Sequence, residues 1–361
     1  MNRSARLASA AALLVAAAGA AVPAAFAAPE PAAVDPAAAA MSLPADESQT
    51  PTATTPAPPP PPNAEPPRPK TGKATLEVDG GIATSKLRYV ARGDRLEIGG
   101  EVRPFVAGQV AVLEVRRSGK VVDRQRAKVR RGKRGAGKLS FRFKPRRKGV
   151  YRAQIRHAAT DGQRAFRSRV ARFKAVVLSA GEGRRGTDAL LLQRGLDALG
   201  YAVPVTGYYD AGTSRAVIAF RKVNGMERVG YASPAVFSLV LKGQGAFRPR
   251  FPDAGYHVEY DWSRQVLGFF RGAKPVNVYH SASGAPATPT VFGTFSFYRK
   301  EPGTNHLGMV QSNYFIRGYA IHGYKDVPIY PASHGCLRVP IPNAYQIDRQ
   351  ISLGMKIMVY E

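Results

Sequence analysis

The sequence predicts a multidomain fold with a β-sandwich, a small domain of three helices and a C-terminal domain that opens with strands. Apolar residues alternate with polar ones over residues 73–178, then recur at helical spacing over residues 184–243. Alternation returns at the start of residues 254–361. At 361 residues the chain is long enough for two or three domains that each bury a core.

The N-terminal residues predict export. Arg3 and Arg6 precede an Ala-rich apolar run that ends in the small-x-small triplet of residues 25–27. Residues 1–27 are therefore expected to be a cleaved signal peptide, which places the mature chain in the periplasm or cell wall. The apolar run is shorter than the roughly 20 residues that cross a bilayer. Residues 28–72 are mostly Ala, Pro and Thr, which predicts a disordered, semi-rigid linker.

Residues 73–178 contain short alternating runs such as Leu139, Phe141 and Phe143, separated by Gly, Asp and Lys, as is typical of antiparallel strands. A nearly continuous apolar run over residues 110–115 favours a strand that is covered on both faces. Several such strands predict a β-sandwich, and the segment resembles the immunoglobulin-like modules of cell-surface proteins. No functional residue follows from that resemblance.

The formal net charge of +28 is concentrated in the middle of the chain. Residues 70–175 contain 30 Lys and Arg against 8 Asp and Glu, a net charge of +22, whereas residues 256–361 have a net charge of +4. A dense cationic surface attracts any polyanion. In an exported chain the expected partners are anionic wall polymers or membrane headgroups, and not nucleic acid. The alternative is a solvated Arg-rich surface with no ligand.

Three short helices are expected in residues 184–243. Gly200 is typical of a helix C-terminus, Asp210 can cap a second helix, and Pro234 suits the first turn of a third. The Leu-Gln opening and the Thr-Gly-x-Tyr-Asp turn resemble the peptidoglycan-binding domain family, which implies a wall-binding module. Arg221 stands where that family commonly has Gln, so no binding residue is assigned. The matching positions are Gln193, Thr206, Gly207, Tyr209, Asp210, Thr213, Ala216, Val217 and Phe220.

The single cysteine, Cys336, lies among residue types that support thiol chemistry. An exported chain with one cysteine has no internal disulfide, so the thiol is either a spare apolar group or a reactive one. Thiols react as thiolates, which a nearby imidazole or cation favours. His334 shares a face with Cys336 in an extended segment, and His322 can return by a strand-loop-strand path, so spacing does not choose between them. Arg338 can bind a substrate carboxylate or favour the thiolate.

Two other interpretations are open at this stage. A lone histidine is more often structural than catalytic, and a buried cysteine is usually inert, although the glycines beside these residues permit close backbone approach. A zinc site could use His322, His334 and Cys336 with His280 or His306. No recurring pair of Cys or His frames a closed structural site, so no metal is expected.

The run Ser-His-Gly-Cys-Leu-Arg at residues 333–338, with Thr-Pro-Thr at 288–290 and Gly-Thr-Phe at 293–295, is similar to the YkuD-like L,D-transpeptidase family. The resemblance implies a mostly β catalytic domain. The short gap between the two histidine-containing clusters predicts a trimmed loop over the site. The roles that the family implies are Cys336 as nucleophile, His322 as proton donor and acceptor, His334 as a supporting residue, Gly323 as the carbonyl that orients His322, and Ser333, Gly335 and Arg338 in the substrate and oxyanion pocket.

The resemblance also implies a reaction with peptidoglycan stem peptides. Cys336 would attack the carbonyl of the third residue of a tetrapeptide stem, release D-Ala and form a thioester, which an amine of a neighbouring stem converts to a 3-to-3 crosslink. No cofactor is implied, and carbapenem-type lactams are expected to acylate Cys336. The alternatives are an L,D-carboxypeptidase that uses water, a cysteine peptidoglycan hydrolase, and a non-catalytic wall-binding protein.

Overall fold

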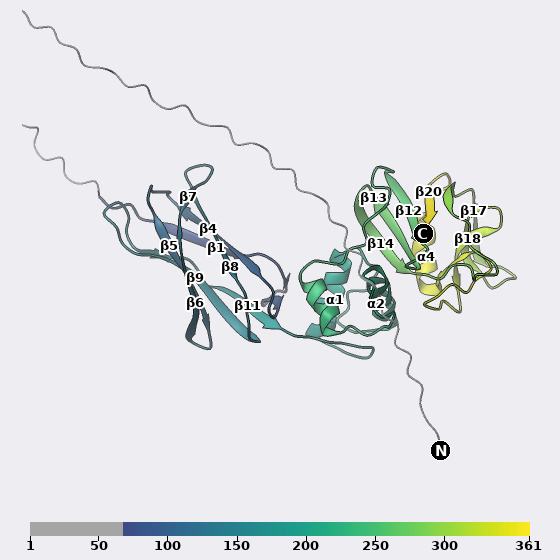
Figure 1. Ribbon diagram of the computed structural model, residues 1–361, viewed down its shortest axis with the longest axis horizontal. Coiled ribbons are helices and arrows are strands. Elements are labelled where there is room, and N and C mark those ends of the chain that lie inside the picture. Colours follow the sequence, from purple (N-terminus) through teal and green to yellow (C-terminus); the bar gives the residue numbers. More distant parts are fainter. Residues whose placement is uncertain (1–67) are drawn as a thin grey trace, which may run out of the picture. The chain divides into compact units, whose positions relative to one another are not determined.

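A computed structural model describes residues 68–361 (Figure 1). The expected signal peptide at residues 1–27 and nearly all of the expected linker at residues 28–72 lie outside the described residues. In residues 68–361 no helix has the length and apolar character needed to span a membrane.

The first folded part consists of two sheets. In the first, the strand order is β1-β4-β8-β7: β1 (Lys73–Val78), β4 (Leu96–Arg103), β8 (Gly137–Phe143) and β7 (Arg130–Arg131). In the second, the order is β2-β3-β11-β9-β5-β6, with β10 beside β9: β2 (Ile82–Ala83), β3 (Arg88–Ala91), β11 (Ala171–Val176), β9 (Gly149–His157), β5 (Val110–Arg117), β6 (Lys120–Lys128) and β10 (Phe166–Arg167).

One core joins the two sheets and makes this part a β-sandwich. Leu139, Phe141 and Phe143 of β8 are buried while the residues between them are exposed, which confirms the predicted alternation. The prediction that residues 110–115 are covered on both faces is only partly right, because Val112 is half-buried. On this strand the carboxylate of Glu114 is ion-paired with three guanidinium groups instead, those of Arg116, Arg124 and Arg156. The likeness to immunoglobulin-like modules stays a prediction.

The second part contains α1 (Thr187–Ala198), α2 (Ala211–Val223) and α3 (Pro234–Leu241), and the predicted helix ends are confirmed. The Asp210 carboxylate accepts a hydrogen bond from the Thr213 N–H at 2.8 Å, as an N-cap requires. Gly200 has φ +85°, the left-handed conformation that glycine adopts most easily after a helix. Pro234 occupies the first turn of α3.

The residues that match the peptidoglycan-binding pattern hold this part together. The buried Gln193 amide donates to the Thr213 hydroxyl at 2.9 Å and to the Tyr208 carbonyl at 2.8 Å, and its oxygen accepts from the Thr206 and Gly207 N–H groups. A buried amide with all of these partners fixes the turn that precedes α2. These matching residues therefore explain the fold more directly than any ligand contact.

Arg221, the residue that departs from the family pattern, is also structural. Its buried guanidinium donates to the carbonyls of Tyr231 and Glu227 at 2.9 and 3.0 Å. These bonds satisfy the backbone of the connection between α2 and α3.

The C-terminal part contains two sheets and one helix. The five-stranded sheet has the order β14-β13-β12-β20-β15: β14 (Lys274–His280), β13 (Val266–Arg271), β12 (Tyr256–Asp261), β20 (Lys356–Tyr360) and β15 (Gly293–Ser296). The four-stranded sheet has the order β16-β17-β18-β19: β16 (Arg299–Thr304), β17 (Val310–Ile316), β18 (Tyr319–Tyr324) and β19 (Leu337–Pro340). Helix α4 (Ile341–Gln350), which the sequence analysis did not anticipate, contacts β17, β18 and β19.

The helical part and the C-terminal part share a hydrophobic core. Phe220 of α2 and Tyr201, which follows α1, pack in the same buried cluster as Phe270 of β13 and Val278 of β14. The Tyr201 hydroxyl donates to the Gly245 carbonyl at 2.6 Å in the connection that leads to β12. Helix α2 is therefore a fixed neighbour of the C-terminal sheet.

Candidate active site

Strands β18 and β19 are parallel neighbours, and their two faces differ. Ile321 and Leu337 are paired in register and point into the core, while Gly323 lies so close to α4 that an added Cβ would approach the Ala344 Cβ to 2.8 Å. Residues at alternate positions point to the opposite face. That face, which we call the active face, carries Ala320, His322 and Tyr324 of β18, and Arg338 and Pro340 of β19.

Cys336 immediately precedes β19 and packs against Ala320, so its side chain lies on the active face. The thiol is half-buried and donates to the Gly318 carbonyl, with 3.6 Å between sulfur and oxygen. Burial raises the pKa of the Cys336 thiol above its ordinary value, and this effect outweighs the nearby charge of Arg338, which lowers it. The resting side chain is therefore a thiol rather than the thiolate that the sequence analysis had considered.

His322 is buried on the active face with one ring nitrogen engaged. Its Nδ1–H donates to the Gly323 carbonyl at 3.0 Å, which leaves Nε2 unprotonated in the neutral ring. Burial lowers the pKa of His322 to about 4, helped by the charge of Arg338, although the Gly323 carbonyl favours the protonated ring. At neutral pH the active face thus carries a neutral thiol and a neutral imidazole.

The turn before Cys336 is built by Ser333 and Gly335. The Ser333 hydroxyl donates to the Cys336 carbonyl at 2.6 Å and accepts from the Gly335 N–H at 3.1 Å. Gly335 has φ +111°, and a Cβ there would lie 2.1 Å from the ring of Tyr319, so only glycine fits. Within residues 68–361 the N–H of Cys336 donates to no protein group, and it remains available to a substrate oxygen.

Two threonines support this turn from behind. The Thr288 hydroxyl donates to the Ser333 carbonyl at 2.9 Å, and the Thr290 hydroxyl donates to the Gly335 carbonyl at 2.7 Å. Thr290 also accepts from the Gly284 N–H at 2.9 Å. The sequence alone gives the Thr-Pro-Thr run no role beyond the family resemblance. The structure places both hydroxyls against the backbone of the Cys336 turn.

His334 and Arg338 point to the rim rather than into the core. Residues 334–336 bend, so His334 does not share an extended segment with Cys336. Its side chain is exposed and makes no hydrogen bond to any residue of 68–361. The Arg338 guanidinium lies 4.1 Å from the centre of the Tyr324 ring. It makes no ion pair among the described residues, so it can receive a carboxylate.

Residues 255–359 match the sequence model of the L,D-transpeptidase catalytic domain, and residues 185–239 match that of a peptidoglycan binding domain. The chain contains an L,D-transpeptidase catalytic domain. The predicted family resemblance is thereby confirmed for both domains.

Solved structures of L,D-transpeptidases also resemble the chain. The crystal structure from Xylanimonas cellulosilytica is 28% identical with a TM-score of 0.48, and covers 51% of this chain and 98% of that chain. The crystal structure from Stackebrandtia nassauensis is 18% identical with a TM-score of 0.33, covering 50% of this chain and 95% of that chain. The catalytic domain from E. faecium is 22% identical with a TM-score of 0.28, and the match covers 31% of this chain and 100% of that chain. No curated protein matches the sequence.

His280 of the catalytic domain, weighed above as a zinc ligand, is engaged at both ring nitrogens. Its Nδ1 accepts from the Lys222 ammonium at 2.9 Å, and its Nε2–H donates to the Val327 carbonyl at 2.9 Å. Burial, and then the charge of Lys222, lowers the pKa of His280 to about 3, so the ring is neutral. In the described part of the chain, no three His, Cys, Asp or Glu side chains are grouped so that they could hold a metal ion.

A buried polar network beneath the active face was missed by the sequence analysis. The Ser281 hydroxyl donates to the Arg338 carbonyl at 2.7 Å, and the Ser283 carbonyl accepts from the Ser333 N–H at 2.9 Å. Gln265 accepts from the Ser283 N–H at 2.8 Å. These bonds hold the backbone on both sides of Cys336.

Lys222 of α2 anchors that network to the peptidoglycan-binding domain. Its ammonium donates to the carbonyls of Gln265 and Ser281 at 3.0 and 2.9 Å, besides His280. The side chain is only 3% exposed, and burial lowers its pKa. The three acceptors around Nζ require three N–H donors and therefore favour the ammonium form. In the sequence Lys222 lies in a predicted helix far from Cys336. Nothing in the neighbouring residues distinguishes it from a lysine on the protein surface.

Proposed function

We propose that this protein is a peptidoglycan L,D-transpeptidase that forms 3-to-3 crosslinks through a thioester on Cys336. The observation that carries the proposal is the active face, which carries both a half-buried thiol and a buried imidazole whose Nε2 is unprotonated. Because thiol and imidazole are both neutral at rest, proton transfer accompanies attack rather than preceding it. The L,D-transpeptidase catalytic domain supports the assignment.

In the acylation step the Cys336 sulfur attacks the carbonyl carbon of the third residue of a tetrapeptide stem, and His322 Nε2 takes the thiol proton. The carbonyl oxygen becomes an oxyanion, which the free N–H of Cys336 stabilises. The carbon–nitrogen bond then breaks, and His322 gives the proton to the departing D-Ala. The Gly323 carbonyl keeps His322 in the tautomer that both transfers need.

In the second step an amine of a neighbouring stem attacks the thioester, and His322 accepts its proton. The carbon–sulfur bond breaks, and the proton returns to the Cys336 sulfur. Arg338 binds a substrate carboxylate, Ser333 and Gly335 shape the pocket, and His334 supports the bound peptide from the rim. No cofactor takes part in either step. Water in place of the amine gives an L,D-carboxypeptidase.

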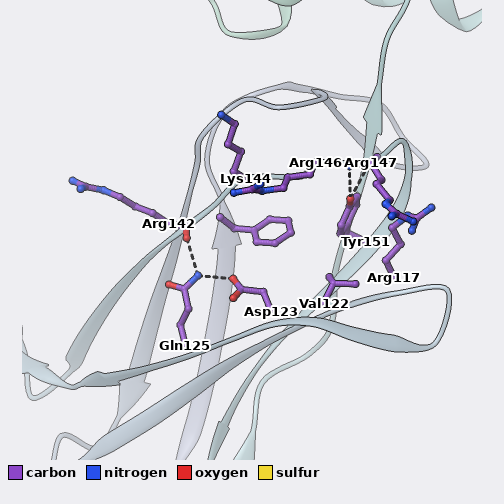
Figure 2. Close-up of a pocket in the computed structure, with 10 residues that line it drawn as sticks. Arg117, Val122, Asp123, Gln125, Arg142, Lys144, Arg146, Arg147 and Tyr151 are labelled. Atoms are coloured by element: carbon purple, nitrogen blue, oxygen red, sulfur yellow. Dashed lines mark hydrogen bonds between the residues drawn. The ribbon is translucent and has the colours of Figure 1, made fainter.

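We further propose that the protein acts outside the cytoplasm and that its basic sandwich binds anionic wall polymers or membrane headgroups. A cleft of about 450 Å³ on the sandwich supports this (Figure 2). Lys144, Arg146 and Arg147 line the cleft and make no ion pair among the described residues. Asp123 lines the same cleft and accepts from the Gln125 amide at 2.6 Å. Cations without carboxylate partners favour a bound anion.

The test is mass spectrometry of a purified disaccharide-tetrapeptide incubated with the full chain, beside the Cys336→Ala variant. We expect loss of D-Ala and a crosslinked dimer with the unchanged protein only. Cleavage without a dimer would indicate the carboxypeptidase or hydrolase alternative. No reaction with either protein, together with retained binding to isolated wall sacculi, would indicate a non-catalytic wall-binding protein.

A further inference from the structure

The active face continues past the catalytic residues into a second cavity. This cavity has a volume of about 370 Å³ and is lined by residues from the peptidoglycan-binding domain and from the catalytic domain. Its lining includes Arg215 of α2, His280 of β14, Tyr324 of β18, Lys325 and Pro340. None of the residues that line the cavity is a carboxylate.

Strand geometry connects the cavity to the thiol. Tyr324 and Pro340 are paired in register and lie two residues beyond His322 and Arg338 on the same face. At about 3.3 Å per residue, Pro340 lies roughly 13 Å along the strand from Cys336. An extended peptide advances by about the same length per residue. The far end of the cavity is therefore within roughly 13 Å of the thiol, so a charged group of a peptide held at Cys336 can enter the cavity.

The charge of the cavity is positive and incompletely paired. The half-buried Arg215 guanidinium donates through Nε to the Asn343 side chain at 3.2 Å, and forms no ion pair among the described residues. Burial lowers the pKa of Arg215, which shows that its charge is partly desolvated. Asp210 and Glu182 are near enough to favour that charge but do not contact it. Lys325 adds a second cation.

His280, which also lines the cavity, offers no negative charge. Both nitrogens of His280 are used in hydrogen bonds, and the ring is neutral. In the described part of the chain the terminal nitrogens of Arg215 have no hydrogen-bond acceptor. A guanidinium in this state matches the two oxygens of a carboxylate.

Arg215 is held at a fixed position relative to the catalytic domain. It lies on α2, the helix whose Lys222 makes three hydrogen bonds to catalytic-domain residues and whose Phe220 packs with Phe270. Both contacts are buried, so α2 keeps its place when the peptide is absent. The cavity is therefore a preformed part of the active face.

We propose that this cavity is a carboxylate-binding subsite for the wall peptide, in which Arg215 binds a carboxylate of the stem peptide whose third-residue carbonyl Cys336 attacks. The proposal rests on the proposed function, because it takes the stem peptide as substrate. It gives the peptidoglycan-binding domain a second task, since one of its residues completes the substrate site of the catalytic domain.

The test measures peptide binding separately from catalysis. In full chains that carry Cys336→Ala, the dissociation constant of the disaccharide-tetrapeptide is compared with that of the same peptide with its free carboxylates amidated. Arg215→Met should weaken binding of the carboxylate form about tenfold and leave the amidated form unchanged, while Arg215→Lys should retain part of the affinity. The matched control is Arg248→Met, because Arg248 is exposed and lies outside the cavity.

A second measurement distinguishes this proposal from the proposed function. The rate of Cys336 acylation by a carbapenem should be the same in Arg215→Met and in the unchanged protein, because the lactam does not reach the cavity. Equal loss of affinity for both peptides, no loss for either, or slower acylation in Arg215→Met would overturn the subsite. Absence of acylation in the unchanged protein would count against the proposed function, while the binding data would still decide the subsite.

Discussion

The basic sandwich and the catalytic domain use polar side chains in opposite ways. The segment that contains the sandwich, residues 70–175, has a net charge of +22, and Lys144, Arg146 and Arg147 of its cleft make no ion pair among the described residues. The catalytic domain is nearly neutral, and its important polar groups are buried in hydrogen bonds with definite donors and acceptors. Charges on a surface act as a sum that salt screens, whereas buried groups act one at a time.

This difference determines how each region should respond to substitution. A surface field changes gradually as charges are removed, because no single cation is essential. A buried donor or acceptor leaves an unsatisfied partner when it is removed, and that penalty is local and large. The predictions below run from single atoms of the catalytic domain to several charges of the sandwich.

The largest expected effect is that of Cys336→Ala. Because no other thiol exists in the chain, crosslink formation and lactam acylation should fall by at least about 10³-fold, to background. The measurement is intact-protein mass spectrometry with a carbapenem, which should add one lactam mass to the unchanged protein only. Binding to wall sacculi should be unaffected, and an adduct on the variant would show that another residue is the nucleophile.

The two histidines provide a matched pair. His322→Gln should lower kcat/KM by about 10² to 10⁴-fold because it removes the proton acceptor, whereas the exposed His334→Gln should cost far less. In the unchanged protein kcat/KM should fall as the pH drops through about 4, where His322 becomes protonated. Equal losses from both substitutions would contradict the assignment of His322.

The same depressed pKa has a consequence for stability. The folded value of about 4 lies below the ordinary 6.5, so between these values the unfolded chain binds more protons than the folded chain. The free energy of unfolding should therefore decrease as the pH falls through this window. Urea denaturation at several pH values checks this, and His322→Gln should show a smaller decrease.

Lys222→Met tests whether the buried network depends on the peptidoglycan-binding domain. It removes one donor from each of the Gln265 and Ser281 carbonyls and from His280 Nδ1, so the free energy of unfolding should fall by about 2 to 4 kcal/mol. Lys274→Met, at an exposed position of β14, is the control and should change it by less than about 0.5 kcal/mol. Thermal unfolding is the measurement. Equal effects would mean that the two domains are stable independently.

The smallest effect per residue is expected in the sandwich. Replacing Lys144, Arg146 and Arg147 together by Gln should weaken binding to an anionic polyol-phosphate polymer and reduce its salt dependence by up to about one unit of log-log slope per charge. Carbapenem acylation should stay the same. Titrations at several salt concentrations, with polymer and with anionic vesicles in parallel, provide the measurement. An unchanged slope would refute a role for this cleft.

Features that depend on neighbouring residues could be predicted well. The alternation of Leu139, Phe141 and Phe143 predicted a strand with one buried face, and Asp210 and Pro234 marked helix starts that the structure confirms. Helix α4 was not predicted, since it begins directly after a strand and contains a proline in its first turn. The Ser-His-Gly-Cys-Leu-Arg run was sufficient to identify the catalytic domain.

The sequence by itself determined the order of the domains, the periodicity of their elements, the location of the basic charge and the residues that are candidates for chemistry. Only the tertiary structure decided that His322, and not His334, is buried on the face that carries the Cys336 thiol. It also decided that thiol and imidazole are neutral, that Lys222 bonds to the catalytic domain, and that Arg215 lines a cavity with catalytic-domain residues. The physical reason is that periodicity and capping are local, whereas burial, pKa and hydrogen-bond partners depend on residues far apart in the chain.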